Sequence, residues 1–163
     1  MTEQQTPAPL EGILVADFSR VLAGPLTTMW LADLGATVVK VEQPGRGDDT
    51  RHWGPPWTAT SSSYFTAANR SKSSVTLDFS DADDLAVAQE LARRADVFVE
   101  NFKAGGLARF GLGHDDVSRT NPGVVYASIT GFGSAQGASV PGYDFVVQAV
   151  GGLMSLTGYP EGD

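Results

Sequence analysis

The chain has 163 residues, of which 42% are apolar and 18% are charged, and its formal net charge is -8. This composition is typical of one globular domain and argues against a disordered chain. The acidic balance disfavours nucleic acid and anionic membranes as partners. The chain has no cysteine, which excludes disulfides and thiolate catalysis and is usual in a reducing compartment. We therefore expect a cytoplasmic protein.

The N-terminal segment, residues 1–9, is polar and contains two prolines. It lacks the basic region followed by an apolar run that defines a signal peptide. No later stretch approaches the roughly 20 apolar residues that cross a bilayer. We expect a flexible tail over 1–9, one folded unit over 10–163 and no membrane association.

The first part of the folded unit has the pattern of a β-α-β unit. Residues 12–18 form a short apolar run rich in strand formers, and 19–24 form the turn after it. Pro25 is predicted at the first position of a helix that ends near Gly35. A second strand over 36–42 follows, and the short helical crossover favours a parallel, right-handed pair of strands.

The next thirty or so residues, 43–72, break this alternation and are predicted to form a long loop. Trp53, Trp57 and Tyr64 indicate that this loop is packed and functional.

Strands and helices then alternate again. Ser80, with Asp83 three residues later, resembles a capping box and predicts a helix through Arg94. Five strands interleaved with helices predict an α/β, Rossmann-like, doubly wound and mostly parallel sheet with flanking helices, which binds ligands at the carboxyl ends of its strands. The other elements expected here are strands over 74–79, 96–100 and 123–129 and a short helix over 107–110.

Several familiar sites are disfavoured. The turn from Ser19 to Pro25 has one glycine and lacks the G-x-G-x-x-G dinucleotide fingerprint. Glu42 stands where a ribose-binding acid would lie, but the simpler interpretation is a solvated strand end. The sequence also lacks a G-x-S-x-G elbow, an H-E-x-x-H motif and a phosphate loop. His52 and His114 are interpreted as structural or surface residues, so no metal site is predicted.

The basic residues are more informative, because six of the eleven flank loops that the fold could gather at one sheet edge. Such a cluster suits a multiply phosphorylated ligand. The alternative is six independently solvated charges. The six residues are Arg46, Arg51, Arg70, Lys72, Lys103 and Arg109.

The order of several motifs resembles the class III coenzyme A transferases, the group that includes formyl-CoA transferase, the carnitine CoA transferases and, as relatives, the α-methylacyl-CoA racemases. The resemblance extends over nearly the whole chain but over less than half of a typical family member. It rests on Leu10 to Gly12 with Asp17 and Phe18, Val21 to Pro25, Leu34 to Ala36 with Lys40 to Glu42, Gly47, Asp48 and Arg51, Asn69 to Lys72, Leu77 and Asp78, Ala95 to Val97 with Glu100 to Phe102, and Thr130 to Gly133.

The resemblance implies that acyl-CoA is a substrate rather than a bound cofactor. Leu22 replaces a glutamine of formyl-CoA transferase, which argues against formyl-CoA or oxalate as substrates. Gln43 and Ser80 replace an arginine and a lysine of that enzyme, which changes the expected placement of the phosphates. Arg46 or Arg51 is expected to compensate for the lost cations. The coenzyme A contacts that the resemblance implies are Leu22, Ala23, Leu77, Asp78, Ser80, Asn101, Phe102, Lys103, Arg109 and Tyr143.

The family mechanism implies a nucleophilic aspartate that forms a mixed anhydride and then an enzyme-bound CoA thioester. The resemblance places that aspartate after Thr157-Gly158, on the order of ten residues past Asp163, so we expect no catalytic nucleophile in this chain. Tyr143, which is given a supporting role, replaces the catalytic histidine of the racemase branch, and a phenol is a poor proton shuttle near neutral pH. Asp144 is interpreted as a helix N-cap or turn acid.

Two hypotheses remain open. In the first, the chain is the N-terminal part of a CoA-transferase that moves coenzyme A from an acyl-CoA donor to a carboxylate acceptor. In the second, it is a coenzyme A-binding or structural module without catalysis; a racemase-like enzyme is the further alternative. The resemblance also implies an interlinked homodimer, so the isolated chain is expected to expose apolar surface and to associate.

Overall fold

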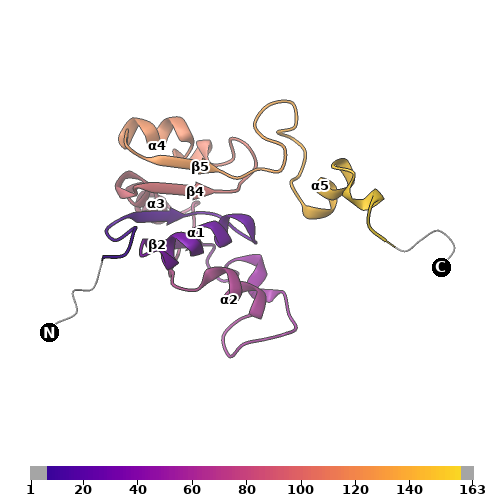
Figure 1. The fold of residues 1–163 in the computed structure, drawn as a ribbon. Helices are drawn as coiled ribbons and strands as arrows, with labels where there is room; N and C mark the ends of the chain where they lie inside the picture. Colours follow the sequence, from indigo (N-terminus) through magenta and orange to yellow (C-terminus); the bar gives the residue numbers. More distant parts are fainter. Residues whose placement is uncertain (1–6, 159–163) are drawn as a thin grey trace.

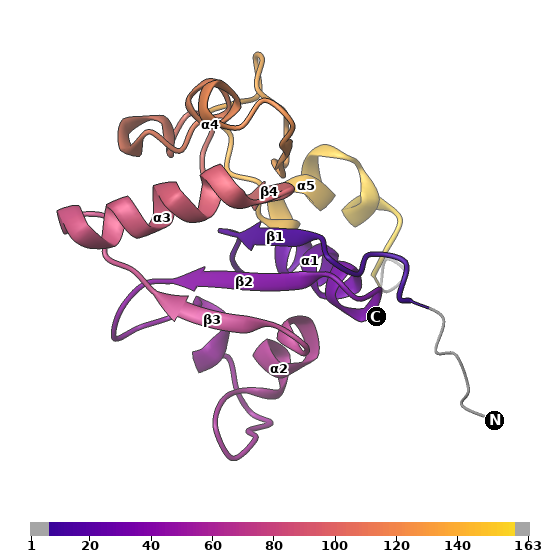
Figure 2. The ribbon, with the colours of Figure 1, turned by 90° about the vertical axis from the view of Figure 1, so that its left-hand side faces the viewer.

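The fold, seen in a computed structural model that describes residues 7–158, is built on one sheet of five parallel strands in the order β3-β2-β1-β4-β5. Figure 1 shows the whole chain, and Figure 2 shows β1, β2 and β3 side by side. The predicted doubly wound α/β fold is therefore confirmed. The strands are β1 (Leu14–Asp17), β2 (Thr37–Glu42), β3 (Ser73–Thr76), β4 (Val97–Glu100) and β5 (Val125–Ser128).

Helices cover both faces of the sheet. One face packs with α1 (Ala23–Asp33) around the buried Val15, Val38 and Val99. The other packs with α3 (Ala82–Arg94) and α4 (His114–Thr120), in a larger cluster that includes Ala88 and Val117. Because every connection between parallel strands crosses a face, the loops that follow the strands all emerge at one edge.

Aromatic stacking anchors the larger core beneath that edge. The Phe98 ring stacks on Phe18 at a centroid distance of 4.6 Å and on Tyr126 at 4.8 Å. Phe98 is fully buried and Phe18 is 2% exposed. Since Phe18 directly follows β1, this stack fixes the point at which the first loop leaves the sheet.

The ends of two helices differ from the prediction. α1 begins at Ala23, so Pro25 is its third residue, where the missing N–H falls among donors that lack helical partners anyway. The N-cap of α3 is Asp81 rather than Ser80, because the Asp81 carboxylate accepts the N–H groups of Asp83 and Asp84. The Ser80 hydroxyl instead donates to Asp78.

The segment 43–72 was predicted as a loop but contains two helices, η1 (Asp49–His52) and α2 (Ser63–Asn69). The η1 helix is capped by Asp48 and α2 by Ser62. The Trp53 ring packs edge to face on Tyr64 at 5.4 Å, whereas Trp57 is 58% exposed. Short helices with side-chain caps thus order a segment that carries no apolar periodicity.

The other elements are shorter than expected or lie apart from the sheet. The strand expected over 74–79 ends at Thr76, and the helix expected over 107–110 is a single 3₁₀ turn, η2 (Ala108–Phe110). Helix α5 (Asp144–Val150) and the 3₁₀ turn η3 (Leu153–Ser155) stand away from the sheet in Figure 1. Within residues 7–158, no helix is long and apolar enough to span a membrane.

Candidate functional site

The loops that follow β1, β2, β3 and β4 meet at the carboxyl edge of the sheet and enclose a crevice. Its cavity volume is about 310 Å³. In a doubly wound sheet this edge is where ligands bind. The crevice is lined by Phe18, Arg20, Lys40, Val41, Glu42, Gln43, Gly47, Asp48, Leu77, Asp78, Phe79, Ser80, Phe102, Arg109 and Phe110.

The structure brings half of the predicted coenzyme contacts together in this crevice: Leu77, Asp78, Ser80, Phe102 and Arg109. The other predicted contacts do not line it: they are Leu22 and Ala23 at the start of α1, Asn101 and Lys103 after β4, and Tyr143 before α5.

Two arginines supply the unpaired positive charge of the crevice. The Arg20 guanidinium lies 4.7 Å from the centroid of the Phe102 ring, and that of Arg109 lies 4.5 Å from the Phe110 ring. Neither arginine forms an ion pair with any carboxylate of residues 7–158. Stacking on a ring holds each guanidinium while leaving its N–H groups available to an anion.

The sequence prediction did not include Arg20. It belongs to the turn directly after the first strand, so its place at the carboxyl edge was the available signal.

The Asn101 amide ties the first turn to the loop after β4. Its Oδ1 accepts the N–H of Arg20 at 2.8 Å, and its Nδ2 donates to the Arg20 carbonyl at 2.6 Å. Asn101 therefore orients the backbone that carries Arg20.

Asp78 and Ser80 form a local turn on the rim of the crevice. The Asp78 carboxylate accepts the Ser80 N–H at 2.9 Å and the Ser80 hydroxyl at 2.7 Å. These two hydrogen bonds hold the pKa of Asp78 below its usual range. The turn places the Asp78 carboxylate on the rim beside the Ser80 hydroxyl.

Of the six residues in the predicted basic cluster, Arg109 lines the crevice. Four others form ion pairs within the chain: Arg51 and Lys72 pair with buried carboxylates, whereas the pairs of Arg46 and Arg70 are exposed at the surface. These pairs are Arg46 with Asp49 at 2.8 Å, Arg51 with Glu42 at 2.6 Å, Arg70 with Asp33 at 2.5 Å and Lys72 with Asp17 at 2.9 Å.

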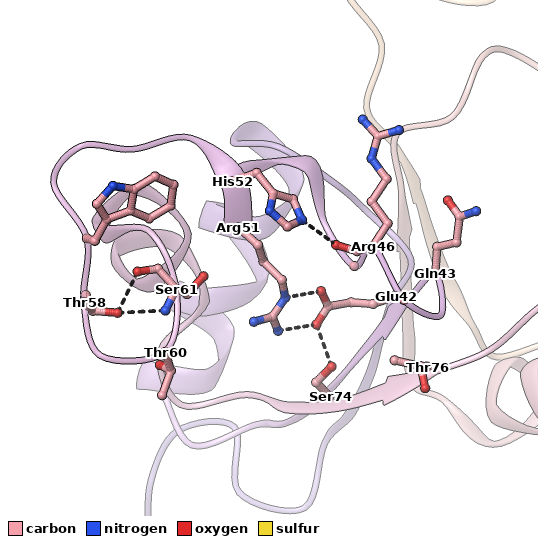
Figure 3. A pocket seen from close by; sticks show the side chains of 13 residues that line it. Glu42, Gln43, Arg46, Arg51, His52, Thr58, Thr60, Ser61, Ser74 and Thr76 are labelled. Carbon is pink, nitrogen blue, oxygen red and sulfur yellow. Dashed lines mark hydrogen bonds and ion pairs between the residues drawn. The ribbon is translucent and has the colours of Figure 1, made fainter.

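Glu42 is not a solvated strand end, because its side chain is 2% exposed and fully hydrogen-bonded. Its two carboxylate oxygens accept from Nε and Nη2 of Arg51 at 2.6 and 2.7 Å, and from the Ser74 hydroxyl at 2.6 Å (Figure 3). Burial alone would raise the pKa of Glu42, but these bonds and the Arg51 charge hold it at about 2. Arg51 also lies over the Phe65 ring, and its Nε and Nη2 are both used by the pair with Glu42.

The Glu42–Arg51 pair lies in the wall of a second, more open cavity, drawn in Figure 3. This cavity has a volume of about 610 Å³ and shares Glu42, Gln43 and Gly47 with the crevice. Its lining includes His52, whose Nε2 lies 3.1 Å from the Arg46 carbonyl oxygen. Hydroxyl side chains supply most of the remaining polar groups of its lining.

Two lysines are buried in ion pairs, and one of them, Lys40, also lines the crevice. Lys40 Nζ lies 3.0 Å from Asp48 Oδ2, and both side chains are at most 1% exposed. Lys72 Nζ donates to Asp17 at 2.9 Å, where burial alone would raise the pKa of Asp17 but Lys40, Lys72 and two hydroxyls lower it. Replacing both members of such a buried pair by apolar residues is often neutral for stability, whereas removing one member alone is strongly destabilising.

Tyr143 and Asp144 lie apart from the crevice. Tyr143 precedes the first residue of α5 and is 70% exposed. Asp144 is the first residue of α5 rather than its N-cap, and its Oδ2 accepts from Gln148 Nε2 at 2.5 Å. The predicted nucleophile position beyond Asp163 lies outside the described residues.

The chemistry of the crevice is that of a binding site. Its two stacked arginines can hold phosphate groups, and its apolar and aromatic side chains can hold an organic moiety. Within residues 7–158, no group of three or more histidine, aspartate or glutamate side chains could hold a metal ion.

The fold and the crevice define an α/β ligand-binding domain with its site at the carboxyl edge of a parallel sheet. Residues 10–163 match the family described as CoA-transferase family III, and the chain belongs to that family.

Relatives and a solved structure agree with this assignment. The chain is 49% identical over 156 residues to succinyl-CoA:glutarate CoA-transferase of Mus musculus, covering 95% of this chain and 36% of that protein. It is 45% identical over 167 residues to acetyl-CoA:oxalate CoA-transferase of Acetobacter aceti, covering 99% of this chain and 42% of that protein. The crystal structure of a CaiB/BaiF family protein from Brucella suis matches with a TM-score of 0.90 and 46% identity, covering 96% of this chain and 42% of that one. The chain thus spans well under half the length of these relatives.

Proposed function

We propose that this chain forms the coenzyme A-binding part of a class III CoA-transferase, which moves coenzyme A from an acyl-CoA donor to a carboxylate acceptor. The observation that carries the proposal is the crevice, where Arg20 and Arg109 lie on aromatic rings at the carboxyl edge and have no ion-pair partner among residues 7–158. Membership of CoA-transferase family III supports the same reaction class.

The lining of the crevice suits the parts of coenzyme A. The phosphates would accept hydrogen bonds from Arg20 and Arg109, because guanidinium N–H groups match phosphate oxygens in geometry and charge. The adenine ring would lie against Phe102 or Phe110, and Leu77 would contact the apolar part of the ligand.

We propose a dicarboxylate as the acceptor. The two relatives described above are named for glutarate and oxalate, which are both dicarboxylates, and their named donors are succinyl-CoA and acetyl-CoA.

The proposed chemistry uses an aspartate that follows Asp163 in the sequence. Its carboxylate attacks the thioester carbonyl and releases the CoA thiolate, which leaves a mixed anhydride. The thiolate then attacks the aspartyl carbonyl, releases the donor carboxylate and gives an enzyme-bound CoA thioester. The acceptor carboxylate attacks that thioester and the sequence runs in reverse, so no proton or electron is gained or lost overall. Tyr143 is proposed to support this site.

A second copy of the chain is the proposed partner of the C-terminal segment. Its apolar side chains have little to pack against in the described part of the chain, which fits the interlinked dimer that the resemblance implies. The exposed fractions are 74% for Phe145, 69% for Val150, 48% for Leu153 and 83% for Leu156.

The test is an assay with succinyl-CoA and glutarate, followed by hydroxylamine trapping of an enzyme-bound thioester. We expect transfer and a trapped hydroxamate from a chain that extends beyond Asp163, and neither from residues 1–163 alone. Turnover by residues 1–163 alone would contradict the placement of the nucleophile. Binding of coenzyme A without any transfer by the longer chain would favour the non-catalytic module.

A further inference from the structure

The turn after β1 contains a backbone conformation that its side chain disfavours. Val21 has φ = 70°, in the left-handed region, although valine is β-branched and has no local means of stabilising that region. Such a residue persists when surrounding groups hold it in place. The turn connects Arg20, in the crevice wall, to Leu22 and Ala23 at the start of α1.

A buried carboxylate holds this residue. The Val21 N–H points at Asp48, 3.3 Å from Oδ1 and 3.2 Å from Oδ2. Lys40 Nζ lies 3.0 Å from the same carboxylate and donates to the Ser19 carbonyl at 2.9 Å. The Lys40–Asp48 pair therefore holds the turn at two points: Lys40 binds the Ser19 carbonyl, and Asp48 binds the Val21 N–H.

The carboxylate is itself fixed by the segment that follows β2. Asp48 Oδ1 accepts the N–H of Thr50 at 3.0 Å and its hydroxyl at 2.8 Å. The Asp48 N–H donates to Glu42 Oε2 at 2.9 Å, and Glu42 is held in turn by Arg51. The end of β2 and the turn after β1 are thus joined by a continuous set of buried polar contacts.

We propose that Asp48, with Lys40, is a positioning pair that presets the turn of residues 19–22 for coenzyme A. This proposal rests on the proposed function, because it concerns the same crevice. Asp48 acts on the ligand through Val21 and Arg20. Asn101 holds the Arg20 backbone from the opposite side, so the turn is fixed from the loops of both neighbouring strands.

The proposal predicts a specific coupling between Asp48 and Val21. Glycine populates positive φ about as readily as negative φ, so Val21→Gly removes the need for a group that holds the conformation. Loss of the positioning pair should then weaken coenzyme A binding strongly in the native background and weakly in the Val21→Gly background.

The test compares coenzyme A affinity by calorimetry across a double-mutant cycle. Replacing both charges together, in Lys40→Met/Asp48→Leu, avoids leaving one buried charge unpaired. We expect this variant to bind coenzyme A about tenfold more weakly in the native background, the factor that matches the disfavoured left-handed conformation. In the Val21→Gly background, we expect a loss of about twofold.

Two further variants separate the possible outcomes. Asp48→Asn keeps an oxygen acceptor for the Val21 N–H, so it should retain more affinity than Lys40→Met/Asp48→Leu, and it remains informative if that variant does not fold. Equal losses in the native and Val21→Gly backgrounds would overturn the positioning role, as would an Asp48→Asn variant that binds no better than Lys40→Met/Asp48→Leu. Arg109→Ala separates failure of the positioning role from failure of the proposed function. If Arg109→Ala binds coenzyme A as tightly as the native chain, the crevice is not the coenzyme A site and the proposed function fails. If Arg109→Ala binds more weakly but the double-mutant cycle shows no coupling, only the positioning role fails.

Discussion

The Glu42–Arg51 pair is expected to make the stability of the folded chain depend on pH, and Glu42→Gln should remove that part of the pH dependence. The pKa of Glu42 falls from its ordinary value of 4.5 to about 2 in the folded chain. Such a fall corresponds to about 3 kcal/mol of folding free energy. Because the folded-state pKa is the lower one, this stability is present above pH 4.5 and is lost as the pH falls from 4.5 towards 2. About 2 kcal/mol of it should be gone by pH 3.

The assay is urea unfolding of the native chain and of Glu42→Gln at pH 6.5 and at pH 3. We expect Glu42→Gln to be less stable by about 3 kcal/mol at pH 6.5, because it leaves the Arg51 charge without its partner. Between the two pH values, it should lose about 2 kcal/mol less than the native chain does. The difference between the two proteins isolates Glu42, since Asp17 and Asp78 also have lowered pKa values and remain in both.

Glu90→Gln is the matched control. The pKa of Glu90 is also held at about 2, by Arg93 and Arg94, but its side chain is 42% exposed. Salt and solvent screen such a surface pair, so its substitution should have a small effect that added salt removes. Equal pH dependence in the native chain and in Glu42→Gln would refute the reasoning from burial and bidentate pairing.

Three other changes test the core, the buried lysine and the C-terminal segment. Phe98→Ala should lower the free energy of unfolding by about 3–5 kcal/mol in denaturant titrations, since it empties the centre of the aromatic stack, whereas the exposed Val125→Ala should change it little. Lys72→Met should cost about 3–5 kcal/mol, because it leaves the Asp17 carboxylate buried without its nearest cation, and a loss below about 1 kcal/mol would contradict that pairing. Phe145→Ser should reduce self-association of the isolated chain in sedimentation velocity, and a native chain that is already a clean monomer would count against an exposed docking surface.

The fold could be predicted because its signals are local. The apolar run before Asp17, the helix that ends just before Gly35 and the strand up to Glu42 each carry a periodicity or a breaker within a few residues. The segment 43–72 was wrongly predicted as a loop because its two short helices are specified by the capping side chains of Asp48 and Ser62 rather than by an apolar stripe.

The site was less predictable, because the sequence does not show which oppositely charged side chain the fold will bring next to a given charged residue. Arg51 and Lys72 read as possible ligand contacts, but the fold brings each to a buried carboxylate, nine residues away for Glu42 and 55 residues away for Asp17. Arg20 was overlooked although it follows the first strand directly. Position relative to the carboxyl ends of the strands was a better guide to the crevice than the number of nearby charges.

The most direct test of the account is calorimetric titration of coenzyme A into the native chain, Arg109→Ala and Lys103→Ala. Arg109 lines the crevice without an ion-pair partner among residues 7–158, whereas Lys103 lies outside it. We expect saturable binding to the native chain, about tenfold weaker binding to Arg109→Ala at an unchanged melting temperature, and a smaller loss for Lys103→Ala. Native affinity in Arg109→Ala, or no binding to the native chain, would contradict it.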